Sequence, residues 1–109
     1  MNQLLSSQKE FARKCIEEAN KVLDIEAKSI LTLKKTIKED FVELIEMIME
    51  SKGRVIVSGV GKSGLVGKKI AATLSSTGTP SFFVHAGEAL HGDLGMITAE
   101  DILIAISNS

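Results

Sequence analysis

A glycine-rich turn directly after a buried strand constrains this chain more than any other feature. It lies in Arg54-Val-Ile-Val-Ser-Gly-Val-Gly-Lys-Ser-Gly64, where three β-branched residues run into glycines at 59, 61 and 64. A continuous apolar run of this kind is typical of a central parallel strand that is covered on both faces. Glycine at 59 and 61 permits positive φ angles and a close approach of the backbone to a ligand.

The turn predicts an anion site. A helix that begins near residues 62–65 would point its free N–H groups and the positive end of its dipole at whatever lies over the turn. Lys62 and Ser63 add a cation and a hydroxyl at the same place. We therefore expect a phosphate to bind here.

The glycine spacing distinguishes three kinds of phosphate loop. A Walker A loop would need its first glycine at position 56, which is isoleucine, so that interpretation fails. A dinucleotide fingerprint is matched by the three glycines, but it also requires an acidic residue at the end of the second strand, where this chain has His85. A nicotinamide-dependent reductase is therefore disfavoured, and a phosphosugar site is the third interpretation.

Hydrophobic periodicity places the other elements. We expect helices over residues 8–33, 40–51 and 63–76, strands over 54–57, 81–84 and 102–106, and a short helix near 87–90. Asp40 with Glu43 resembles a capping box, and Leu65 and Ile70 are expected to face the sheet. A strand, a helix and a second strand in this order predict a right-handed βαβ unit with parallel strands.

The predicted fold class is α/β, with a parallel central sheet preceded by two helices. We assign residues 1–52 to an N-terminal helical segment and residues 53–109 to the first part of a phosphosugar-binding domain. The broad apolar stripe of helix 8–33 suggests a subunit contact, although packing on its own domain explains it equally well. An apolar third strand with nothing after it to cover its far side indicates the N-terminal part of a larger domain.

Composition disfavours several other classes. The chain has 13 basic and 14 acidic side chains and lacks tryptophan and tyrosine, so neither nucleic acid nor a membrane surface is an expected partner. The one cysteine, Cys15, permits no internal disulfide, fits a reducing cytoplasm and is expected to be an unreactive core residue. No segment approaches the roughly 18 apolar residues of a membrane-spanning helix, and we expect a soluble, cytoplasmic protein.

Residues 85–97 concentrate the reactive side chains. His85 and His91 are the only histidines, and both are expected near the carboxyl ends of parallel strands, where α/β sheets bind ligands. Their pairing with Glu88 and Asp93 favours substrate contact, although each carboxylate would equally suit a helix cap or a turn. Isomerisation of a sugar phosphate needs a phosphate anchor, a base and a group that stabilises an enediolate, and Lys62 suits the first or the last role.

Three stretches resemble the sugar isomerase (SIS) domain of the arabinose-5-phosphate isomerases of the KdsD/KpsF/GutQ type. They are Gly59-Val-Gly-Lys-Ser-Gly64, Ala71-Ala-Thr-Leu-Ser-Ser-Thr-Gly-Thr-Pro-Ser-Phe-Phe-Val-His85 and Glu88-Ala-Leu-His-Gly-Asp-Leu-Gly-Met96. The resemblance implies interconversion of D-ribulose 5-phosphate and D-arabinose 5-phosphate through an enediolate, for Kdo, lipopolysaccharide or capsule biosynthesis. It also implies a three-layer α-β-α, flavodoxin-like domain and a homo-oligomer, typically a tetramer with active sites between subunits.

The resemblance further implies particular site residues. Lys62 and His91 would be catalytic, and substrate contacts would come from Gly61, Ser63, Gly78, Thr79, His85, His91, Ser107 and Ser109. No cofactor is expected to be required, and zinc is kept open at His85, although the spacing forms no recognised zinc motif. Ser107 and Ser109 resemble the opening of the family's second phosphate loop, whose remaining residues would lie beyond residue 109. The alternative is a SIS module that binds a phosphosugar without catalysis, as a sensor or regulator.

Overall fold

The computed structural model describes residues 2–89 and 92–107, and it divides into two units, Met1–Phe41 and Val42–Ser109. The first unit contains one long helix, α1 (Asn2–Leu33), which begins earlier than the predicted residue 8. Ion pairs such as Arg13–Glu17, at 2.7 Å, lie along its surface. No helix in the described part of the chain is long and apolar enough to cross a membrane.

The apolar side chains of α1 are exposed, among them Phe11, Ile16, Leu23 and Ile30. Cys15 is exposed too, so its prediction as a core residue is wrong. The physical reason is that the unit Met1–Phe41 holds only this helix and the start of the next one, and therefore has no second layer that could bury a side chain of α1.

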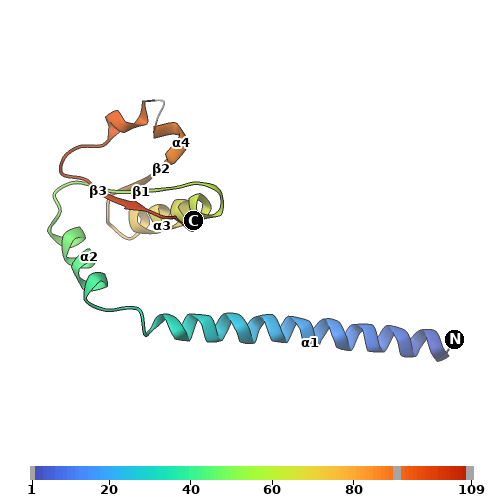
Figure 1. The fold of residues 1–109 in the computed structure, drawn as a ribbon. Helices are drawn as coiled ribbons and strands as arrows, with labels where there is room; N and C mark the ends of the chain where they lie inside the picture. The colour runs from blue at the N-terminus through green and yellow to red at the C-terminus, as the bar shows by residue number, and fades with distance from the viewer. Residues whose placement is uncertain (1, 90–91, 108–109) are drawn as a thin grey trace. The chain divides into compact units, whose positions relative to one another are not determined.

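The second unit is built on a parallel three-stranded sheet (Figure 1). Its strands are β1 (Val55–Gly59), β2 (Ser81–His85) and β3 (Ile102–Ala105), in the spatial order β2-β1-β3. The register pairs Gly59 with His85 and Ser58 with Ala105, so the carboxyl ends of the three strands lie together. The predicted α/β fold with a parallel central sheet and preceding helices is confirmed.

The core is centred on β1, which has a strand on each side. Val55, Ile56 and Val57 are almost fully buried, as the continuous apolar run predicted. Helix α2 (Glu39–Glu50) contributes Ile48 to this core.

The helix α2 begins differently from the prediction. It starts at Glu39, so Asp40 lies inside its first turn, and the Asp40 carboxylate accepts a hydrogen bond from the N–H of the next residue, Phe41, at 2.9 Å. The predicted capping box of Asp40 with Glu43 is therefore wrong. The residue that would have been the cap is already helical, and a cap must lie just outside the helix.

Helix α3 (Gly61–Ser76) packs on β1 and β2 through small residues rather than large ones. Gly64, Gly67 and Ala71 are buried, whereas Leu65 is 67% exposed, so the prediction that Leu65 faces the sheet is wrong. A Cβ on Gly67 would lie only 3.1 Å from Val57 Cγ1 and 3.0 Å from a ring carbon of Phe83. The helix approaches the sheet so closely that only small residues fit between them.

The connection from β2 to β3 contains two short elements, α4 (Ala86–Ala89) and a 3₁₀ helix, η1 (Asp93–Met96). Helix α4 contacts both β2 and η1. Figure 1 shows α3 and the α4–η1 segment on opposite sides of the sheet. On β3 burial alternates, and Leu103 is 56% exposed, so one face of this strand is covered less than the other.

Candidate phosphate-binding site

The turn between β1 and α3 has the backbone of an anion site. Gly59 ends β1, Val60 is extended with φ −127° and ψ 156°, and Gly61 opens α3 with φ +58°. The positive φ predicted at Gly61 is confirmed, but Gly59 does not have one. Glycine is needed at 59 for a different reason, since a Cβ there would lie 3.0 Å from the carbonyl carbon of Ser63 where the helix turns back over the strand.

The amino terminus of α3 is open. Val60 makes no side-chain cap, and no acidic residue lies in the first turn. The Gly64 N–H donates to Val60 O at 3.2 Å, which is the first hydrogen bond of the helix. The N–H groups of residues 61–63 have no carbonyl oxygen within the helix to which they could donate. Lys62 is exposed and Ser63 is half-buried at the same turn. Free N–H groups, the positive end of the helix dipole, a cation and a hydroxyl therefore all belong to one helical turn, which favours an anion.

His85 lies beside this turn because it is the last residue of β2 and pairs with Gly59. Its Nδ1 accepts a hydrogen bond from the Gly87 N–H at 3.1 Å. This bond assigns the proton of the neutral imidazole to Nε2, so that Nε2–H is a donor for a substrate oxygen. Gly87 permits the contact, since a Cβ there would crowd the same ring at 3.1 Å.

Ser107 reaches the same edge from β3. Ala105 pairs with Ser58, and the N–H of Ile106 donates to Ser58 O at 2.9 Å, which carries the chain past the end of β1. The structure therefore brings five predicted site residues to the carboxyl edge of the sheet: Gly61, Lys62, Ser63, His85 and Ser107.

The structure separates Gly78 and Thr79 from this group. They follow the carboxyl end of α3 and precede β2, so they lie at the amino edge of the sheet, about 13 Å from the carboxyl edge at roughly 3.3 Å per strand residue. Gly78 has φ +105°, and the Thr79 N–H donates to Leu74 O at 2.8 Å. These two residues end a helix at that edge, and their contact with substrate stays a prediction.

The remaining predicted residues have no described geometry that tests them. His91 and Ser109 lie outside the described residues, and Glu88 is exposed on α4. Among the described residues, no group of three or more His, Cys, Asp or Glu side chains could hold a metal ion. Zinc at His85 therefore stays a prediction, and no chemical step is assigned to it.

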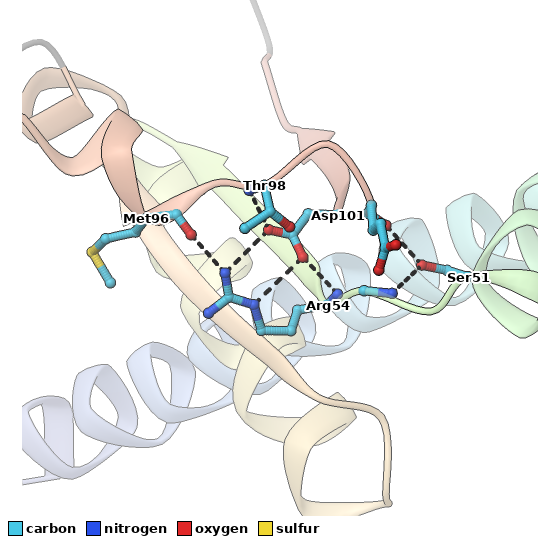
Figure 2. Close-up of polar contacts among 7 residues, drawn as sticks. Ser51, Arg54, Met96, Thr98 and Asp101 are labelled. Atoms are coloured by element: carbon cyan, nitrogen blue, oxygen red, sulfur yellow. Dashed lines mark hydrogen bonds and ion pairs between the residues drawn. The ribbon is translucent and has the colours of Figure 1, made fainter.

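Sequence reasoning missed a polar cluster at the amino edge, formed by Arg54 and Asp101 (Figure 2). One carboxylate oxygen of Asp101 accepts from the Arg54 backbone N–H at 2.7 Å, and the other accepts from the Thr98 N–H at 2.8 Å. The backbone N–H groups of Thr98 and Arg54, and then the Arg54 side chain, hold the pKa of Asp101 well below its ordinary value of 3.8. An Asp that closes a turn just before a strand was the available signal.

The fold agrees with that of a known domain family. The family model of the SIS domain matches residues 47–109, more than half of the chain, so this chain belongs to the SIS domain family. That membership confirms the resemblance on which the sequence predictions rested.

Comparison with curated proteins identifies relatives of this chain that are arabinose 5-phosphate isomerases. The chain is 55% identical over 94 residues to arabinose 5-phosphate isomerase KdsD of Pseudomonas aeruginosa and 50% identical over 94 residues to arabinose 5-phosphate isomerase GutQ of Escherichia coli K12. Each alignment covers 86% of this chain and 29% of the relative. The chain therefore spans less than a third of the length of these relatives.

Solved structures show the same similarity. The Escherichia coli CFT073 protein c3406, in complex with arabinose 5-phosphate, matches with a TM-score of 0.65 and 48% identity, over 73% of this chain and 44% of that one. A candidate phosphosugar isomerase involved in capsule formation, from Bacteroides fragilis, matches with a TM-score of 0.82 and 40% identity, over 86% of this chain and 50% of that one.

Proposed function

We propose that this chain forms the phosphate-binding part of an isomerase that interconverts D-ribulose 5-phosphate and D-arabinose 5-phosphate. The observation that carries the proposal is the uncapped amino terminus of α3, with Lys62 on its first turn and His85 beside it. The similarity to KdsD and GutQ, and to a protein in complex with arabinose 5-phosphate, supports this substrate over other phosphosugars.

Each residue at the carboxyl edge has a role in this proposal. The N–H groups of residues 61–63 and the Ser63 hydroxyl bind the phosphate, and Ser107 adds a hydroxyl from the end of β3. Lys62 neutralises the phosphate or the enediolate oxygen that develops as a proton moves between neighbouring carbons. The Nε2–H of His85 donates to a sugar oxygen. His91 is the proposed second catalytic residue, and Ser109 the proposed next member of the phosphate loop.

The wider assignment follows the same relatives. We propose residues 53–109 as phosphosugar-binding domain and residues 1–52 as a helical segment before it. We also propose a cytoplasmic homo-oligomer, a tetramer, that needs no cofactor and serves Kdo, lipopolysaccharide or capsule synthesis. The exposed apolar side chains of α1 support an oligomer, and the Bacteroides fragilis similarity supports a role in capsule formation.

A phosphosugar-binding module without catalysis is the second candidate. The anion-binding features of the turn at residues 59–64 favour it as much as they favour the isomerase, because they would bind a phosphate whether or not a proton is then moved. Binding and turnover therefore have to be measured separately.

The test uses two proteins, the 109-residue chain and a chimera in which it replaces the aligned residues of the Pseudomonas aeruginosa relative. Both are assayed for conversion of D-ribulose 5-phosphate and for protection from thermal unfolding by D-arabinose 5-phosphate. Binding and turnover in the chimera support the isomerase, whereas binding without turnover supports the module. Protection by a nicotinamide dinucleotide instead of the pentose phosphate would overturn both.

Lys62→Ala provides the residue-level test. We expect kcat/KM of the chimera to fall about 100-fold, because a preorganised charge at a developing anion typically contributes this much. Lys69→Ala is the matched control, since Lys69 lies on the same helix two turns away and should leave activity unchanged. Equal activity in the Lys62→Ala variant and the control would remove Lys62 from the mechanism.

A further inference from the structure

Arg54 lies where the amino ends of all three strands meet. It directly precedes β1, and its carbonyl oxygen accepts from the N–H of Ile102, the first residue of β3, at 2.9 Å. Its guanidinium carbon lies 4.8 Å from the centre of the Phe82 ring in β2, a cation–π contact. One residue, through its backbone and its side chain, therefore joins three elements that are far apart in the sequence.

The guanidinium has three hydrogen bonds to the segment before β3 (Figure 2). Its Nη2 donates to the carbonyl oxygen of Met96 at 2.6 Å and to the Asp101 carboxylate at 3.1 Å, while Nε approaches the other carboxylate oxygen at 3.4 Å. The planar fork of arginine suits this arrangement, because a single ammonium could not serve all three acceptors in one geometry.

Asp101 holds that fork in one orientation. Its side chain is only 1% exposed, and its oxygens also accept the backbone N–H groups of Arg54 and Thr98. A carboxylate bonded on both oxygens stays ionised and does not rotate. Arg54 is therefore fixed at one side by Asp101, and its Nη2 also donates to the carbonyl oxygen of Met96.

Met96 connects this cluster to the candidate site. It is the last residue of η1, whose backbone lies close to that of α4. Helix α4 begins directly after His85, and the N–H of its Gly87 donates to the imidazole of His85. A continuous set of contacts thus runs from the amino edge of the sheet to the histidine at the carboxyl edge.

We propose that Arg54 is a positioning residue for the phosphate-binding site: by holding the Met96 carbonyl it fixes η1 and α4, and through them the imidazole of His85. The catalytic consequence rests on the proposed function. The structural consequence, a fixed His85 ring, does not, and it is measurable without substrate.

Two variants and two controls test this in the 109-residue chain. Arg54→Met removes all guanidinium contacts, and Arg54→Lys keeps the charge near Phe82 and Asp101 but loses the fork. Arg13→Met removes an exposed arginine on α1 that pairs with Glu17. Ala71→Gly destabilises the buried face of α3 without touching the cluster, and it therefore measures the effect of lower stability alone.

The first readout is the imidazole nitrogen signals in the NMR spectrum. The chain has two histidines, so a His85→Gln variant assigns them. We expect both Arg54 variants to move the His85 signals from the Nε2–H tautomer toward the average of two tautomers. Amide exchange over residues 86–89 and 93–96 should rise about tenfold or more as the segment opens locally. Unchanged signals and exchange in Arg54→Met, or equal changes in Ala71→Gly, would overturn the proposal.

The second readout is kinetic and uses the chimera. We expect Arg54→Lys to lower kcat about tenfold while KM stays within about twofold, because the phosphate is bound at the separate turn of residues 59–64. A rise in KM with unchanged kcat would overturn the catalytic consequence. If the wild-type chimera shows no turnover, the proposed function fails, while the NMR readout still decides whether Arg54 positions His85.

Discussion

The two edges of the sheet use their polar groups in opposite ways. At the amino edge Arg54, Asp101, Ser51 and the backbone around them bond to one another, and these bonds join segments more than forty residues apart in the sequence. At the carboxyl edge the amino terminus of α3 has no side-chain cap, and Lys62 is exposed. The same sheet thus carries a structural cluster at one edge and groups suited to a ligand at the other.

This difference follows from topology. Parallel strands bring all their carboxyl ends to one edge, where the amino termini of the following helices also lie, and ligands of α/β folds bind there. The chain must return to the other edge between strands, and in the β2–β3 connection it does so without a long helix. Hydrogen bonds hold this connection in place instead: Arg54 donates to the carbonyl oxygen of Met96, and Ser51 donates to that of Glu100.

The largest effect we expect comes from Gly53→Ala at the amino edge. A Cβ at Gly53 would lie 2.3 Å from the carbonyl oxygen of Glu100, a backbone atom that cannot move without opening the cluster. The free energy of unfolding should fall by about 3 kcal/mol, the upper part of the usual range for overpacking. Chemical denaturation followed by circular dichroism measures it.

Gly95→Ala is the matched control for that substitution, because a Cβ there meets nothing within 4 Å. A similar stability for the two variants would show that the contact between residues 53 and 100 is loose. The contrast between a tightly packed amino edge and an open carboxyl edge would then fail.

A smaller effect is expected from Gly61→Ala at the carboxyl edge. Space is free around this position, but φ is +58°, which costs a residue with a Cβ about 1 kcal/mol. Unfolding measurements should show that loss, and Gly61→Asn should show less of it, because asparagine tolerates the left-handed conformation. Equal losses for alanine and asparagine would point to a cause other than φ.

The elements that sequence predicted best are those fixed by local pattern. The apolar run 55–57 identified the central strand, and the glycines after it identified the turn, because both features depend on neighbouring residues. The burial of Leu65 was predicted wrongly, since helical periodicity does not reveal how closely a helix approaches a sheet. Gly64 and Gly67 indicate the close approach, but only when their contacts with Gly59 and Phe83 are known from the structure.

The direction of the parallel strands explains where the predicted site residues lie. Lys62 and His85 follow predicted strands directly, so topology alone brings them to one edge. Gly78 and Thr79 follow α3 and precede β2, so the parallel direction of the strands already implies that they lie at the opposite edge. Asp101 closes a turn just before β3, which is a local signal, but its pairing with Arg54 connects residues 47 positions apart, and no local pattern indicates that partner.

The smallest effect that we expect is a change in how the free energy of unfolding depends on pH, rather than a loss of the fold. The folded protein holds the pKa of Asp101 well below the ordinary 3.8, so at acid pH the unfolded chain binds more protons than the folded one. The stabilisation is therefore complete above the ordinary pKa and declines as the pH falls through 3.8 and below. In Asp101→Asn the acid-dependent part is absent, so the difference in unfolding free energy between wild type and variant should shrink steadily as the pH is lowered from about 5 to about 2.

Lys62 and the other carboxyl-edge groups are common to both proteins and cancel in this comparison. A difference that stays constant across the range would mean that Asp101 titrates normally, and that the amino edge does not depend on its charge.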